Sequence, residues 1–234
     1  MGKSSTFQYT LKRRANSNKI SLNVSIQNGL EVTVPKGIRR SSIERVLENN
    51  KDWIAQSLDQ VSERLNRLVP RDIKLQATGE SWEVEYQPTS SLLVSVVEKE
   101  ENTLLVQGNI EDRYEVALAL RQWLTSRGHA HLVPWLHELS KEFNLPFNKA
   151  GVRGQRTRWG SCSAQGTISI NRNLLFLPRN LVRYVLIHEL VHTVQLDHSQ
   201  KFWKLLLERE PLGRELGGEV RNCWCHVPNW AYER

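Results

Sequence analysis

The sequence predicts a mixed α+β fold, because strand-like and helix-like patterns alternate along it. Apolar residues that alternate with polar ones near the N-terminus predict paired strands, and periodic apolar residues over 43–68 predict a long helix. A strongly apolar stretch over 181–194 predicts a second helix that is buried. The 234 residues are enough to bury a sizeable core. We expect three parts: a hairpin and long helix over 1–70, short strands over 71–110, and a domain over 111–234 that holds the buried helix.

The first expected element is a β-hairpin. Two runs of alternating apolar residues flank Asn28-Gly29, a dipeptide typical of two-residue hairpin turns. The apolar positions are Ile20, Leu22, Val24 and Ile26 before the turn, and Leu30, Val32 and Val34 after it. Ser41 and Glu44 then match a capping box at the start of the long helix, and Pro70 ends that helix.

The middle of the chain predicts three more strands, around 82–86, 92–97 and 104–106. A helical pattern follows over 112–143, and we expect a break or kink in it near Gly128 and Pro134. No internal repeat is evident. Thr167, Ser169 and Asn171 alternate with Ile168 and Ile170, which predicts a strand just before the buried helix.

The buried helix carries the most informative motif, His188-Glu189-Leu190-Val191-His192. Residues four apart lie only about 40° apart around a helix axis, so the two imidazoles share one face, as in a chelate for a divalent metal. Glu189 can act as general base toward a metal-bound water. His198 is a third ligand if the chain leaves the helix near Leu196 or Asp197, and Ser199 can cap the next helix.

Three protein ligands and one open position define a catalytic zinc site, so we expect one Zn²⁺. Two alternatives stay open. The three histidines could simply pack in or near the core, or a wide turn after Leu196 could replace His198 with an acid such as Glu208 or Glu215.

Several blocks around this motif resemble one known family. The blocks are Arg158 to Ser163 (RWGSCS), Gly166 to Asn171 (GTISIN), Tyr184-Val185, the histidine motif itself, His198-Ser199 and Phe202-Trp203. Together they are similar to the YgjP-like metallopeptidase domain, a zincin family akin to the bacterial SprT-like and yeast WLM proteins. The resemblance is strongest over 150–206. It implies a zincin-like metal domain and a zinc-dependent hydrolase, with His188, His192 and His198 as ligands and Glu189 as base. Membership does not imply a particular substrate, and we expect a peptide or protein.

The chain departs from the related metzincin pattern, which shares the spacing of the three histidines. Gln195 stands where metzincins have a glycine, and the only methionine is Met1, so no methionine turn lies beneath the metal. Candidates to stabilise the oxyanion or contact substrate are Arg156, Arg158 and Tyr184, by proximity in sequence alone.

The strand over 167–171 leads to two interpretations. At the rim of a zincin cleft, an exposed strand edge would bind an extended peptide by β-augmentation. A fully paired interior strand would have no such role. The residues themselves do not separate the two.

Two other function classes stay open: a protease that acts on DNA-bound proteins, and a zinc hydrolase of small amides. Residues 1–70 hold 12 Lys and Arg against 6 Asp and Glu, so Lys12, Arg13 and Arg14 could contact phosphates. Aromatic residues are not interleaved with them, and a mild basic excess is more often a solvated face. Nucleic acid is therefore the less favoured partner.

Composition favours a cytoplasmic protein. No apolar run approaches the roughly 20 residues that span a bilayer, and the N-terminus lacks the apolar core of a secretory signal. Three cysteines, an odd number, argue against a disulfide framework. Cys223, Cys225 and His226 are too closely spaced for a usual zinc site, and we favour simple packing of Trp224 and Trp230 there. Cys162, in a Gly- and Ser-rich turn, is interpreted as a packed residue rather than a nucleophile.

Overall fold

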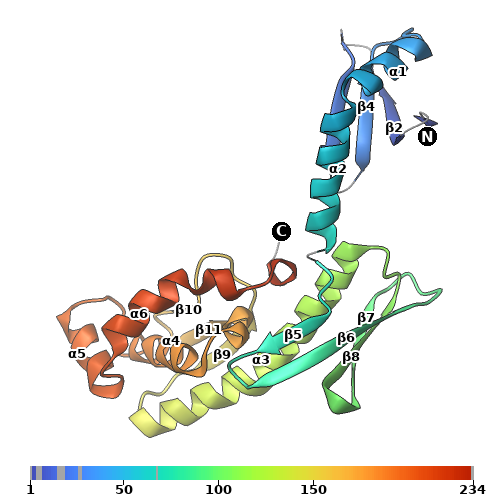
Figure 1. Ribbon diagram of the computed structural model, residues 1–234. Coiled ribbons are helices and arrows are strands. Elements are labelled where there is room, and N and C mark those ends of the chain that lie inside the picture. Colours follow the sequence, from blue (N-terminus) through green and yellow to red (C-terminus); the bar gives the residue numbers. More distant parts are fainter. Residues whose placement is uncertain (1, 4–6, 15–18, 26–27, 67, 233–234) are drawn as a thin grey trace. The chain divides into compact units, whose positions relative to one another are not determined.

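The computed structural model describes residues 2–3, 7–14, 19–25, 28–66 and 68–232, and its fold is mixed α+β, as the sequence predicts. The chain divides into two compact units, Met1–Arg67 and Leu68–Arg234. Figure 1 shows the first unit in blue to cyan and the second in green to red. Each unit has its own cluster of buried apolar side chains.

The first unit contains a four-stranded sheet with the strand order β1-β2-β4-β3. Its strands are β1 (Gly2–Lys3), β2 (Gln8–Arg13), β3 (Ser21–Ser25) and β4 (Gly29–Val34). The predicted hairpin is confirmed, since β3 and β4 pair antiparallel. Its turn is not Asn28-Gly29, however, because Gly29 already pairs with Ser25. Gly29 has a φ of +61°, a left-handed conformation that glycine adopts without strain. Of the predicted strand positions, Ile26 lies outside the described residues.

The prediction of one long helix over 43–68 is wrong, because two helices occupy this region: α1 (Arg40–Asn49) and α2 (Lys51–Asn66). Between them, the side chain of Asn50 donates from Nδ2 to the carbonyl of Val46 over 2.7 Å. Asparagine competes with the helix backbone in this way, which explains a break that apolar periodicity does not reveal. The capping box is also wrong. The N-cap is Arg39, with no side-chain hydrogen bond, and Glu44 instead accepts from Arg40.

The second unit begins with a sheet of order β5-β6-β8-β7, formed by β5 (Asp72–Leu75), β6 (Glu80–Pro88), β7 (Ser95–Lys99) and β8 (Thr103–Gly108). Three of these strands confirm the predicted ones, although Leu92 and Leu93 precede β7 and are largely exposed. The pairings β5–β6, β6–β8 and β8–β7 are antiparallel, parallel and antiparallel. The first sheet has the same succession, so the two units repeat an arrangement that the sequence does not make evident.

Helix α3 (Arg113–Phe143) runs unbroken through Gly128 and Pro134, so of the break or kink expected there, a break is wrong. The carboxylate of Asp112 caps its start by accepting from two backbone N–H groups. Gly128 serves close packing instead, because a Cβ atom there would lie 2.8 Å from Cγ1 of Val152.

A three-stranded sheet of order β10-β11-β9 follows, with β9 (Lys149–Arg153), β10 (Gly160–Cys162) and β11 (Thr167–Asn171). The remaining α-helices are α4 (Arg179–Val191), α5 (Gln200–Arg209) and α6 (Gly213–Asn222). Short 3-10 helices are η1 (Glu100–Asn102), η2 (Arg172–Phe176), η3 (Cys223–His226) and η4 (Asn229–Ala231). One apolar core extends from β5 to η4, so residues 71–110 share their core with the region that follows. In the part of the chain that the structure describes, no helix is long and apolar enough to cross a membrane.

Candidate metal centre

Helix α4 places the first two histidines at the edge of the core. Its apolar side chains are buried on most sides, and they include Leu181, Val182, Val185, Leu186, Ile187, Leu190 and Val191. His188 lies on the last turn of the helix and His192 is its C-cap residue. Because the buried contacts fix the rotation of α4, both imidazoles are held on one face.

The chain turns directly after His192, earlier than the predicted exit near Leu196. The N–H groups of Thr193 and Gln195 donate back to the last carbonyls of α4. The carboxylate of Asp197 accepts from the backbone N–H of Ser199 over 3.1 Å and from Nε2 of Gln195 over 2.6 Å. Asp197, rather than the predicted Ser199, therefore supplies the side-chain contacts at the start of α5. This tight turn returns His198 to the other two histidines.

The three imidazoles form one cluster. The Nε2 atom of His188 lies 3.1 Å from Nε2 of His192 and 3.1 Å from Nε2 of His198. One ring nitrogen from each of the three residues lies within 4.8 Å of the other two. Ligands about 2.0–2.1 Å from a tetrahedral zinc lie about 3.3 Å apart, so these residues fit a zinc ion. Among the residues described, no other group of three His, Cys, Asp or Glu side chains converges in this way.

Phe202 supports the cluster from α5. Its fully buried ring lies with its centroid 4.9 Å from that of His188, and 4.7 Å from those of both His192 and His198. The ring of Phe202 thus packs beneath the site, where metzincins have the methionine that this chain lacks. Burial lowers the pKa of His188 to about 3, helped by the charges of His192 and His198, and burial also lowers the pKa of His192. Both rings are therefore neutral near pH 7, the form that binds metals.

Two contacts orient the imidazoles on the side away from the cluster. Nδ1 of His192 lies 3.0 Å from the carbonyl oxygen of Gln195, so this nitrogen carries the proton and donates it. The lone pair of Nε2 is then available to bind a metal. Nδ1 of His188 lies 3.5 Å from the hydroxyl of Tyr184. Tyr184 is thus placed as an orienting residue, a role that the sequence did not assign to it.

Glu189 lies beside the cluster and is 6% exposed. Its Oε2 atom is buried without a hydrogen-bond partner among the described residues. Burial raises the pKa of Glu189 to about 8, and the positive charge of Arg158 partly opposes this. Gly160 on β10 packs against this side chain so closely that a Cβ atom would lie 2.5 Å from Oε1. A buried carboxylate with a free oxygen is suited to proton transfer.

A pocket of about 400 Å³ opens at the cluster. His188, Glu189, His198 and Tyr184 line it. Residues that sequence reasoning missed complete its walls: Trp159 and Gly160, then Trp203 on α5, then Arg214, Gly217, Val220 and Arg221 on or next to α6. Positions 214, 217 and 221 share one helical face, but no local signal ties that face to a metal site some 25 residues earlier. Trp159 fixes this wall by donating from Nε1 to the carbonyl of Val220 over 3.0 Å.

The other predicted site residues lie elsewhere. Arg156 and Arg158 are exposed and line a different cavity from the one at the cluster, although the positive charge of Arg158 acts on Glu189. Lys12, Arg13 and Arg14 belong to the first unit, where Lys12 forms an ion pair with Glu31.

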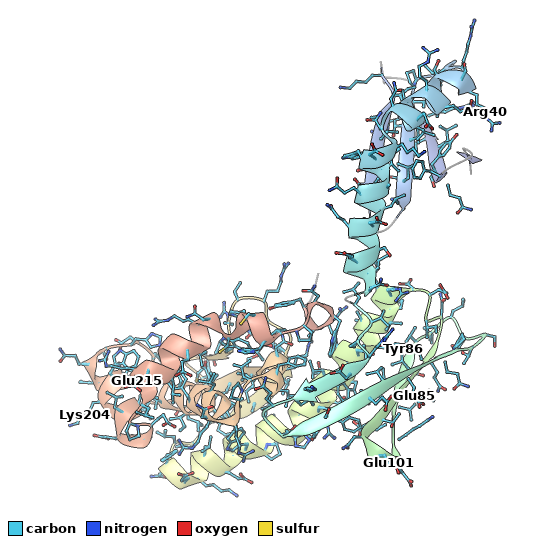
Figure 2. The ribbon with its side chains drawn as sticks, viewed as in Figure 1. Arg40, Glu85, Tyr86, Glu101, Lys204 and Glu215 are labelled. Atoms are coloured by element: carbon cyan, nitrogen blue, oxygen red, sulfur yellow. The ribbon has the colours of Figure 1, made fainter. Side chains whose placement is uncertain are left out.

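The alternative third ligands do not join the cluster. Glu208 is exposed beside Arg209, and Glu215, labelled in Figure 2, is exposed on α6. All three cysteines are free. Burial raises the pKa of the Cys162 thiol, which the charge of Glu189 raises further, so Cys162 is a poor nucleophile.

The C-terminal segment packs as expected. Trp224 stacks on Trp159 with a centroid distance of 3.9 Å, and Trp230 is buried. Cys223, Cys225 and His226 form no metal-ligating group among the residues that the structure describes.

Comparison with known proteins gives the family. The family model of the YgjP-like metallopeptidase domain matches residues 18–216, most of the chain. The chain belongs to the YgjP-like metallopeptidase family. Among curated proteins, none matches it. A solved structure, the metallopeptidase zymogen of Pyrococcus abyssi abylysin, is 21% identical to this chain, with a TM-score of 0.37. The match covers 40% of this chain and 95% of the abylysin chain. At that level of similarity we draw no functional conclusion from it.

Proposed function

We propose that this YgjP-like protein is a zinc metallopeptidase in which His188, His192 and His198 hold the metal and Glu189 moves the proton. The observation that carries the proposal is the convergence of three imidazoles beside a buried carboxylate oxygen without a partner among the described residues. Family membership supports a metal-dependent peptidase.

A bound zinc ion would supply a Lewis acid that lowers the pKa of a coordinated water and favours the ionised form of a nearby carboxylate. The protein supplies the rest. The carbonyl of Gln195 keeps the ring of His192 oriented toward the cluster, and the hydroxyl of Tyr184 does the same for the ring of His188. Phe202 closes the space beneath the rings to water.

Glu189 is the proton carrier in this proposal. Its carboxylate accepts the proton of the attacking water and then passes it to the leaving amine of the cleaved peptide bond. Gly160 allows the carboxylate to lie against β10, where a larger residue would displace it. Tyr184 and Arg221 line the same pocket, which supports them as the donors to a developing oxyanion.

The substrate is proposed to lie along β10. Of the two interpretations left open for the strand over 167–171, the paired one holds, because β11 pairs with β9 on one side and β10 on the other. Within the described ranges, β10 has a partner strand on one side only. Its other edge can therefore bind an extended peptide by backbone hydrogen bonds, next to Glu189.

The direct test is Glu189→Gln, assayed on unfolded casein. We expect a loss of roughly 10²- to 10⁴-fold in kcat, the usual contribution of a general acid–base group, with stoichiometric zinc retained. The matched control is Glu138→Gln, which makes the same change at an exposed position of α3 that also follows a histidine, His137. Wild-type activity in a zinc-loaded Glu189→Gln protein would remove Glu189 from the mechanism.

The same assay separates the other function classes. Hydrolysis of a small amide without any cleavage of casein would indicate a small-amide hydrolase. Cleavage of a basic protein only when DNA is added would indicate a protease directed at DNA-bound proteins.

A further inference from the structure

A second cavity, of about 830 Å³, lies on the opposite side of β10 from the metal pocket. Ser161 lines this cavity, whereas the preceding residue, Gly160, lines the metal pocket. Successive residues of a strand face opposite sides, so β10 separates the two spaces. A peptide paired with β10 would have the same alternation and would send every second side chain toward the second cavity.

The second cavity is strongly basic. Arg153, Arg156, Arg158 and Arg172 line it, and the described residues around it include no aspartate or glutamate. Within the described part of the chain, Arg153, Arg156 and Arg158 form no ion pair. Arg172 is 5% exposed, and its contacts include hydrogen bonds to the hydroxyl of Thr125 and the carbonyl of Ala231.

The loop that carries these arginines is held in place. Asn171 is fully buried, and its Nδ2 atom donates to the carbonyl of Gln155 over 2.7 Å and to that of Arg158 over 2.9 Å. Gly154 lies against Arg172, where a Cβ atom would be 2.2 Å from the guanidinium carbon. The basic side chains therefore project from a fixed backbone, which lowers the entropy cost of binding an anion.

We propose that this cavity binds acidic side chains of the peptide substrate and so gives the enzyme a preference for glutamate or aspartate near the scissile bond. The inference rests on the proposed function, because it places the substrate along β10. Arginine is suited to this role, since its guanidinium binds a carboxylate through two parallel hydrogen bonds.

An acidic peptide fits the cavity better than a nucleic acid. The lining residues include no aromatic side chain on which a base could stack, although stacking platforms are general in single-strand binding sites. The cavity also shares β10 with the metal pocket, so a ligand there is in register with the reacting bond.

The test uses two fluorogenic peptides that differ only in having Glu or Gln at alternate positions around the cleaved bond. Wild type should cleave the Glu peptide with a kcat/KM about tenfold higher, the effect of one charge-assisted hydrogen bond. Arg153→Ala/Arg156→Ala should lose this preference, because the KM for the Glu peptide rises to that for the Gln peptide. The control, Arg39→Ala/Arg45→Ala, removes the same charge from exposed positions of the first unit and should keep the preference.

A second measurement does not depend on cleavage. Binding of a labelled Glu peptide to zinc-loaded Glu189→Gln protein, followed by fluorescence anisotropy, should weaken about tenfold when Arg153 and Arg156 are also replaced. Arginine-dependent binding without any cleavage by wild type would support the cavity and contradict the peptidase proposal. Equal kcat/KM for the two peptides in wild type would overturn the inference. So would an oligonucleotide that binds more tightly than the Glu peptide and depends on the same arginines.

Discussion

The Nε2 atom of His198 lies 3.1 Å from that of His188, although ten residues separate them in the chain. The turn that brings them together depends on Asp197, whose carboxylate accepts from Ser199 and Gln195. These hydrogen bonds, together with burial of Phe202, place the third imidazole over the same space as the first two.

His198→Ala should therefore lose zinc. Removal of one of three protein ligands should cost more affinity than the roughly 10- to 100-fold that loss of an outer-shell partner costs. Dialysis against a chelator that leaves wild type loaded, followed by metal analysis, measures this. His137→Ala, at an exposed position of α3, is the control and should retain zinc. Tight zinc binding with near-normal activity in His198→Ala would exclude the three-histidine site.

Gly160→Ala should reduce activity, because the new methyl group would lie 2.5 Å from Oε1 of Glu189 and must displace that carboxylate. We expect a fall in kcat of about 100-fold, toward the effect of losing a general base, with zinc retained. Gly151→Ala on β9 is the matched control, since no atom lies within 4 Å of a Cβ there. Equal kcat values for the two variants would show that the contact between Gly160 and Glu189 is irrelevant to catalysis.

The metal-free protein should show a pH dependence that originates at Glu189. Burial raises the pKa of this group from 4.5 to about 8. The native state then holds a proton that the unfolded state releases, so Glu189 lowers the free energy of unfolding as the pH rises between these values. The Glu189→Gln variant has no ionisable group at this position and therefore lacks this decrease in the free energy of unfolding. Its stability relative to wild type should rise from pH 5 to pH 8, by on the order of a few kcal/mol.

Urea unfolding of both chelator-treated proteins measures that difference. The lowered pKa of His188 has the opposite effect on the free energy of unfolding. This free energy is unaffected by His188 above pH 6.5 and decreases as the pH falls from there toward about 3. It is present in both proteins and cancels in the comparison. A difference that does not change with pH would contradict the raised pKa of Glu189.

Residues 68–234 should fold without the first unit, because the two units have separate apolar cores. The truncated chain should unfold cooperatively and bind one zinc ion. Circular dichroism and metal analysis of this fragment provide the check. A fragment that remains unfolded in the presence of zinc would show that its core needs residues 1–67.

Local patterns predicted the parts of the site that lie close in sequence. The spacing of His188 and His192 on one helix is a local property, so sequence alone places these two rings together. The breaks were harder to predict: Asn50 ends a helix that apolar periodicity continues, and Gly128 continues a helix that glycine was expected to interrupt. In both cases a specific contact outweighed an average propensity.

Features set by long-range packing could not be predicted in this way. The pocket wall from α6 depends on Trp159 reaching the carbonyl of Val220, 61 residues away. The assignment of the free edge to β10 rather than β11 depends on the parallel pairing of β9 with β11. Strand order is a property of the assembled sheet, and residue alternation alone does not determine which strand is central.

The most direct test of the metal centre is an anomalous-scattering map at the zinc edge from crystals of the zinc-loaded protein. We predict one strong peak within about 2.0–2.1 Å of the Nε2 atoms of His188, His192 and His198. No peak there, or a peak at Cys223, Cys225 and His226 instead, would contradict the three-histidine site on which the proposed function depends.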